Sequence, residues 1–218
     1  MASRRERSRK AGLSVPPKMT PKLIWQGITH PVWTYHTLKR GLPNLRTVAH
    51  YTNNTDMKFV SGFVGNRLGG TLNWDYCKEL KDSWRGPVVL KGILHPKDAQ
   101  KAIEIGLDGI YVSNHGARQF NGAVTAIDAL PEIVKTVNGK VPILFDSGIR
   151  SGLDVMRALH LGADFVLAGR PFIYGVAALG KLGGDHIANI LIDDLKNNMV
   201  QLGVHSLKKL KKTKGITS

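Results

Sequence analysis

A polar segment that follows a short apolar run carries the side chains best suited to chemistry. Residues 109–112 (Gly-Ile-Tyr-Val) are typical of a buried strand, and residues 113–119 (Ser-Asn-His-Gly-Ala-Arg-Gln) turn abruptly polar. This arrangement predicts that His115 and Arg118 lie at one rim of a parallel sheet, where α/β proteins bind ligands. The alternative is a polar loop whose histidine satisfies a backbone carbonyl. We favour a functional site because a second polar segment follows the next predicted strand.

That second segment favours a phosphate. Residues 145–152 (Phe-Asp-Ser-Gly-Ile-Arg-Ser-Gly) follow a strand and open a helix. Small residues let backbone N–H groups approach an anion, and the start of a helix adds a partial positive charge. The next predicted strand ends in Ala-Gly-Arg-Pro (168–171), so two adjacent strand ends each carry a glycine and an arginine. They predict a phosphate cradle with charge-assisted contacts from Arg150 and Arg170. A pair of tight turns with surface arginines is the alternative.

The elements that must position these side chains alternate between strand and helix from residue 86 onward. Hydrophobic patterning predicts strands at roughly 87–91, 109–113, 141–145 and 165–168, and helices at 97–105, 126–137, 153–161 and about 172–202. Residues 98–108 recur in pattern as residues 154–164, an offset of 56 at both ends (154 − 98 and 164 − 108). Two strand–helix–strand copies with one period predict successive units of a parallel (β/α) barrel of the TIM type. A doubly wound sheet is the alternative.

Composition limits the class of protein. The chain has 218 residues and a net charge of +15, which suggests anionic partners, although much of the charge lies in two basic tails. The single Cys77 excludes an intrachain disulfide, and the histidine spacings match no metal motif, so no metal is expected. No apolar run is long enough to span a membrane. We therefore expect a cytoplasmic protein with residues 1–85 as a loop, arm and weakly helical segment, a domain at 86–207, and a basic tail at 208–218.

The motifs resemble those of a known family, the FMN-dependent α-hydroxy-acid dehydrogenases and oxidases of the L-lactate dehydrogenase and glycolate oxidase type. Residues 113–119 are similar to the signature of that family. Residues 146–150 and the pair Gly169-Arg170 resemble its FMN-phosphate segments. The resemblance runs from about residue 86 to residue 207. It implies a TIM-type barrel, FMN as cofactor and a small L-2-hydroxy acid as substrate.

The resemblance also implies roles for individual residues. His115 would be the general base, because imidazole has an unperturbed pKa near neutrality. Arg118 and Arg5 would clamp the substrate carboxylate. Lys91 would face the N1/C2=O edge of the flavin and stabilise the reduced ring, which Ser113 would also contact. The residues implied for the ribityl-phosphate are Asp146, Ser147, Gly148, Ile149, Arg150, Gly169 and Arg170.

The sequence departs from the family in one large respect. Four strands are predicted, whereas such a barrel has eight, so this half-barrel would have two unpaired edges. We expect the carboxy-terminal part of a longer or split protein. A complementary amino-terminal half or a second copy of the chain would close the barrel. The remaining possibility is that the chain folds poorly by itself and is inactive. Peripheral contact with a membrane is compatible with the charge.

Two functions from other classes compete with a flavin oxidoreductase. One is a half-barrel that binds FMN or another phosphate ligand without redox chemistry. The other is a basic nucleic-acid-binding protein, suggested by the net charge alone. The chain has no RRM, zinc-finger or helix-turn-helix pattern, so we expect no nucleic-acid partner. Selectivity for one hydroxy acid is expected to depend on the absent half and on mobile loops.

Overall fold

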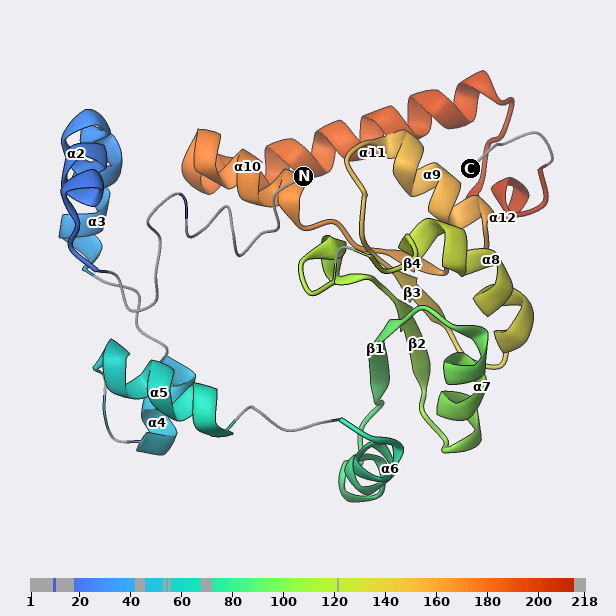
Figure 1. Cartoon of the computed structure of the whole chain (residues 1–218). Helices are drawn as coiled ribbons and strands as arrows, with labels where there is room; N and C mark the ends of the chain where they lie inside the picture. Colours follow the sequence, from blue (N-terminus) through green and yellow to red (C-terminus); the bar gives the residue numbers. More distant parts are fainter. Residues whose placement is uncertain are drawn as a thin grey trace. The chain divides into compact units, whose positions relative to one another are not determined.

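The computed structural model describes residues 10, 18–41, 46–52, 54, 56–67, 72–120 and 122–213 (Figure 1). The chain divides into two compact units, Met1–Leu72 and Asn73–Ser218. The second unit includes the helix that precedes the boundary expected at residue 86. Arg5 lies outside the described residues.

The described part of the first unit is helical. Its elements are α2 (Pro21–Thr29), α3 (Pro31–Arg40), α4 (Arg46–Thr52) and α5 (Met57–Arg67). The Thr20 side chain caps α2 by accepting the N–H of Leu23 at 3.2 Å, and a proline begins each of the first two helices. The hydroxyl of Thr34 donates to the carbonyl of Gly27 at 2.6 Å and joins α2 to α3. Neither α2 nor α3 buries a residue.

The second unit contains the sheet. Its elements in chain order are α6 (Trp74–Ser83), β1 (Val89–Ile93), α7 (Pro96–Glu104), β2 (Gly109–Val112), η1 (His115–Ala117), α8 (Ala126–Val137), β3 (Ile143–Phe145), α9 (Gly152–His160), β4 (Phe165–Val166), α10 (Arg170–Leu179), η2 (Gly180–Leu182), α11 (Gly183–Gln201) and α12 (Leu207–Leu210).

The four strands are parallel and lie in the order β1-β2-β3-β4. A doubly wound sheet would reverse its strand order at a switch point. Sequential order is that of a (β/α) barrel, so the prediction of an incomplete half-barrel is confirmed.

The two faces of this sheet differ. Ile110, Val112 and Phe145 are buried in a core that α7, α8 and α9 complete (Figure 1). The other face exposes Val89 and Phe165. Side chains alternate between the faces with a period of two, as in any strand. The half-barrel therefore has a helix-covered outer face and an open inner face.

The sequence repeat marks a structural repeat. Helices α7 and α9 begin and end 56 positions apart (152 − 96 and 160 − 104). The aspartates at the ends of the two copies, Asp108 and Asp164, accept the backbone N–H of Val88 at 2.7 Å and of Ile143 at 2.9 Å. Each carboxylate also accepts a lysine ammonium, at 2.6 and 2.7 Å. In each repeat, the aspartate that follows the helix thus forms a hydrogen bond at the start of the strand that precedes that helix.

The helical region expected at 172–202 is two helices. Gly180, with φ of 58°, ends α10, and η2 leads into α11. The two helices touch where a Cβ added to Gly183 would lie 2.1 Å from the carbonyl oxygen of Gly175. Because no larger side chain fits this contact, these two glycines permit the close packing of α10 on α11.

Candidate active site at the carboxyl edge of the sheet

The predicted site residues follow neighbouring strands at the same edge of the sheet. Lys91 lies in β1, Ser113 directly follows β2, and Asp146 directly follows β3. Gly169 lies between β4 and α10. The imidazole-bearing turn and the glycines of the predicted cradle therefore share one edge, as the sequence predicted.

The carboxylate of Asp146 is the centre of the site. Its Oδ2 accepts Lys91 Nζ at 2.6 Å and the hydroxyl of Tyr111 at 3.0 Å. Its Oδ1 accepts the hydroxyl of Ser113 at 2.5 Å and that of Ser147 at 2.8 Å. Four donors from three strand segments thus converge on one carboxylate.

These contacts determine the protonation states of Asp146 and Tyr111. Burial by itself would raise the pKa of Asp146, but the hydrogen bonds led by Lys91 and Ser113 outweigh it and hold the pKa below its ordinary value. Burial, and then the neighbouring carboxylate, raise the pKa of Tyr111 far above its ordinary value. At neutral pH Asp146 is therefore ionised and Tyr111 is a neutral donor.

The ammonium of Lys91 is held on several sides. Besides Asp146 it donates to Ser113 Oγ at 2.9 Å, and it lies 3.8 Å from the ring centroid of Tyr111. The cation that the sequence predicted is present, but Asp146 compensates its charge. The site thus offers a preoriented ion pair rather than an isolated positive charge.

Tyr111 was missed by the sequence analysis. Lys91 and Tyr111 are partners in the register between β1 and β2, so their side chains stand together on the inner face of the sheet. Tyr111 also lies two positions before Ser113, on the same face of its strand. That spacing is the signal that could have identified it.

The turn that carries His115 has an unusual backbone. His115, Gly116 and Ala117 have φ values of 56°, 63° and 58°, all left-handed. The N–H of His115 donates to Ser113 Oγ at 3.1 Å, and a Cβ added to Gly92 would lie 3.0 Å from the imidazole Cε1. The side chain is exposed, and among the residues that the structure describes none forms a hydrogen bond with the imidazole. The site thus holds the backbone of His115 while its ring remains accessible.

The two glycines of the predicted cradle border open space. Gly148 has φ of 91°, and a Cβ added there or at Gly169 would meet nothing within 4 Å. Gly169 is the N-cap residue of α10 and has no side chain to cap that helix. Arg170 begins α10, and its Nη2 would lie 3.0 Å from a Cβ on Gly116, which places the guanidinium beside the histidine turn. Open glycines, an uncapped helix start and an arginine fit the phosphate of FMN.

The start of α9 differs from the expectation. The N–H groups of Arg150 and Ser151 donate to Asp154 Oδ2 at 2.9 and 3.0 Å. The N–H of Gly152 donates to Asp194 Oδ2 at 2.6 Å. Carboxylates of the chain itself thus occupy these amides: Asp154 through a capping box with Ser151, and Asp194 from α11. The open amide positions lie at Gly148 and at the start of α10 instead.

The remaining predicted residues are placed as follows. Ile149 is buried in the core, with 4% of its surface exposed. The guanidinium of Arg150 donates to the carbonyl of Ile149 at 3.1 Å. Arg118 ends the histidine turn with its side chain exposed.

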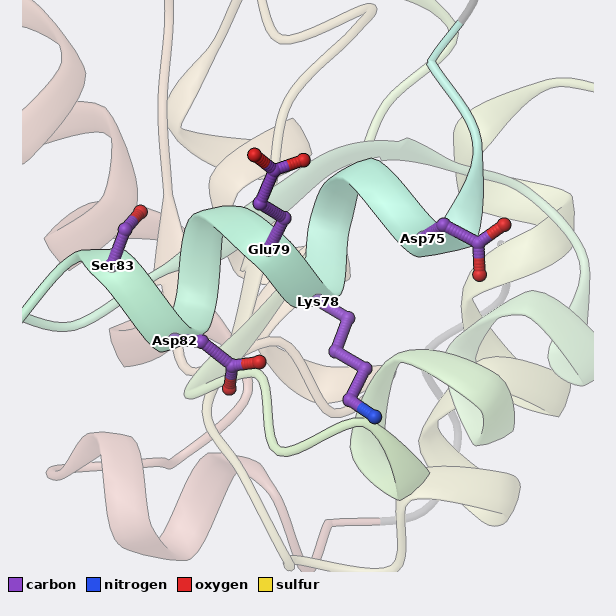
Figure 2. A pocket seen from close by; sticks show the side chains of 5 residues that line it. All are labelled: Asp75, Lys78, Glu79, Asp82 and Ser83. Atoms are coloured by element: carbon purple, nitrogen blue, oxygen red, sulfur yellow. The ribbon is translucent and has the colours of Figure 1, made fainter.

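A surface hollow of about 500 Å³ lies elsewhere, along α6 (Figure 2). Its lining residues come from this one helix and are Asp75, Lys78, Glu79, Asp82 and Ser83. None of them is a predicted site residue. The described residues contain no group of three or more His, Cys, Asp or Glu side chains placed to hold a metal ion. Within the same ranges, none of the helices has the length and apolar character of a membrane span.

Comparisons with known proteins identify relatives of this chain. The family model described as FMN-dependent dehydrogenase matches residues 1–216. The L-lactate dehydrogenase of Pseudomonas aeruginosa is 40% identical over 205 residues, which cover 93% of this chain and 54% of that protein. An L-lactate oxidase of Lysinibacillus sphaericus is 45% identical over 164 residues, covering 75% of this chain and 42% of that protein. The chain thus spans about half the length of these relatives.

Solved structures give the same picture. The crystal structure of the monotopic membrane protein (S)-mandelate dehydrogenase superposes with a TM-score of 0.89 at 31% identity, over 94% of this chain and 54% of that one. A mandelate oxidase with (S)-2-phenylpropionate superposes with a TM-score of 0.63 at 40% identity, over 66% of this chain and 43% of that one.

Proposed function

The chain belongs to the FMN-dependent dehydrogenase family, and on that premise we propose that it supplies the phosphate-binding and proton-transfer part of an oxidoreductase acting on small L-2-hydroxy acids. The observation that carries this proposal is the meeting of Lys91, Asp146 and the His115 turn at the same sheet edge as two open glycines. An anion site and a proton acceptor at one edge suit a phosphate-bearing flavin and an alcohol substrate.

Each group in the site has a proposed part. FMN, once bound, would accept the two electrons that leave the hydroxy acid. Gly148, Gly169 and Arg170 would hold its phosphate through backbone N–H groups and a guanidinium. Lys91, fixed by Asp146, would give the flavin edge an oriented charge. The other proposed phosphate contacts are Arg150 and the backbone N–H groups of Ser147 and Ile149, and Ser113 would contact the flavin ring.

The substrate part is proposed for the histidine turn. An imidazole nitrogen of His115 would take the proton of the 2-hydroxyl group as the 2-oxo acid forms. Arg118 would bind the substrate carboxylate, together with Arg5. The relative named for lactate supports a small 2-hydroxy acid of the lactate or glycolate type, and the neighbour named for mandelate shares with it the 2-hydroxy acid group.

Completion of the barrel is part of the proposal. The inner face of the sheet exposes Val89 and Phe165, and within the described residues no side chain forms a hydrogen bond with the imidazole. We expect the chain alone to bind FMN without turning over substrate. We name as the completed barrel a fusion in which the amino-terminal part of the Pseudomonas aeruginosa L-lactate dehydrogenase precedes this chain. Turnover is expected in that fusion. A homo-oligomer that turns over without that part would contradict this expectation.

Replacing Arg170 by alanine is expected to weaken FMN binding by about tenfold or more, since a hydrogen bond between charged groups is lost. Arg150→Ala is expected to weaken it less, because that guanidinium already donates to a carbonyl. Quenching of flavin fluorescence on titration measures both affinities. Riboflavin, which lacks the phosphate, is the matched ligand and should bind all variants equally. FMN affinity unaltered in both variants would count against the phosphate cradle.

The first unit supports a second function, contact with a membrane surface. We name the exposed side of α2 and α3 the hairpin surface; its large apolar side chains are Ile24, Trp25, Ile28, Val32, Trp33, Tyr35 and Leu38, all at least 50% exposed. Residues 18–41 contain four Lys or Arg and no Asp or Glu. Aromatic and aliphatic side chains beside basic ones suit anionic lipid. The similar mandelate dehydrogenase is described as monotopic. We therefore propose a cytoplasmic protein that docks on anionic membrane through this hairpin.

Vesicles test the hairpin surface. The chain should co-sediment with vesicles of phosphatidylcholine and phosphatidylglycerol more than with phosphatidylcholine alone, and salt should weaken the binding. The double variant Trp25→Ser, Trp33→Ser should lose most of it. Trp84→Ser is the matched control, because Trp84 is 59% exposed but lies in the second unit. If the double variant instead changes only the oligomeric state, the hairpin binds a second copy and the membrane proposal is wrong.

A further inference from the structure

We propose that Ser147 is a positioning residue that holds the turn of His115 through its hydroxyl group. The inference rests on the proposed role of His115 and adds a residue to that site. The sequence analysis placed Ser147 only among the residues implied for the ribityl-phosphate. The structure gives its hydroxyl three partners.

The hydroxyl of Ser147 bridges two strand ends. Its oxygen accepts the backbone N–H of Asn114 at 3.2 Å and that of Gly116 at 3.1 Å, the residues on either side of His115. The same hydroxyl donates to Asp146 Oδ1 at 2.8 Å. One donor and two acceptor positions are all that a hydroxyl offers, so its hydrogen-bonding capacity is fully used. The turn after β2 is thereby tied to the end of β3 at both flanks of the histidine.

The backbone of Ser147 has a conformation that is unusual for a residue with a side chain. Its φ of 85° lies in the left-handed region that favours glycine. Of the non-glycine residues with positive φ in the described ranges, three lie in this site, namely Ser147, His115 and Ala117. The fourth, Asn138, closes α8. Strained backbone persists where the surroundings enforce it, and it concentrates at functional sites.

The tie matters because it fixes the Cα of His115. The hydroxyl of Ser147 and that of Ser113 together accept the N–H groups of three consecutive residues of the turn, 114 to 116. No side-chain partner of the imidazole was found among the described residues, so the backbone is what directs the ring within this chain. A misplacement of about 1 Å can cost up to about a hundredfold in rate.

Two variants separate positioning from mere stability. Ser147→Ala removes the hydroxyl and keeps the strain, whereas Ser147→Gly removes both. The glycine variant should therefore be the more stable of the two in thermal unfolding. Substrate-dependent flavin reduction, measured in the completed barrel at saturating FMN, should fall about tenfold in both variants alike. If activity instead follows stability, with glycine near the parent and alanine low, Ser147 has only a structural role and the proposal is wrong.

Amide hydrogen exchange provides a readout that needs neither flavin nor substrate. In the unmodified chain by itself, the N–H groups of Asn114 and Gly116 should exchange slowly, and both variants should accelerate them by about tenfold or more, with no change in β2. Unchanged exchange would overturn the proposal even if the proposed oxidation is right. A different result would be faster exchange in the Ser147 variants together with unchanged flavin reduction in His115→Ala. The Ser147 hydrogen bonds would then be supported, and His115 would lose its proposed role as the base.

Discussion

Replacing His115 by alanine is expected to lower substrate-dependent flavin reduction in the completed barrel by a factor of about 10² to 10⁴. The reason is the loss of the proposed proton acceptor of the 2-hydroxyl group. FMN affinity should change little, because the predicted phosphate contacts lie after β3 and β4, whereas His115 follows β2. Stopped-flow absorbance of the flavin measures the rate, and titration measures the affinity.

His186→Ala is the matched control for this variant. His186 is exposed on α11, outside the carboxyl edge of the sheet, so its removal should leave both rate and affinity as they were. Equal rates in the His115 and His186 variants would exclude His115 as the base. A parallel loss of FMN affinity in the His115 variant would show that the turn contributes to cofactor binding.

Replacing Phe145 by alanine is expected to lower the free energy of unfolding by about 3–5 kcal/mol, the usual cost of removing a large buried aromatic ring. Phe145 ends β3, is 0% exposed, and packs in the core beneath the helices. Urea unfolding followed by circular dichroism measures the change. Such a loss is a large part of the stability of a domain of this size.

Phe165→Ala supplies the comparison on the opposite face. Phe165 lies in the adjacent strand β4 but is 61% exposed on the inner face, so its removal from the chain alone should cost less than about 1 kcal/mol. In the completed barrel that face should be covered, and the same substitution should then cost clearly more. Equal losses for Phe145 and Phe165 in the isolated chain would contradict the assignment of the two faces.

Much of the fold could be predicted because its signals are local. Helix α8 was predicted at the residues it occupies, and strand β2 was placed correctly to within a residue. The repeat that relates α7 to α9 was also read from the sequence. Helical hydrogen bonds and strand alternation depend on neighbours a few positions away, so hydrophobic period and glycine stops are enough.

Several strand and helix boundaries lie away from their predicted positions. β1 begins at Val89 rather than 87, and Val88, just before it, donates its N–H to Asp108, 20 positions further along the chain. β3 begins at Ile143 rather than 141 because Pro142 has no N–H for the ladder. The amides at the start of α9 were expected to be open, but Asp194, 42 positions further along the chain, occupies one of them.

By itself the sequence determined the order of strands and helices, the family signature, and the edge of the sheet at which the proposed site lies. Only the tertiary structure decided that the sheet is a sequential half-barrel with an open inner face. It also showed that Lys91 and Tyr111 meet Asp146, 55 and 35 positions apart in the chain, and that the Ser147 hydroxyl holds the histidine turn. The physical reason is that strand pairing sets the register, and register decides which side chains from different strands stand side by side.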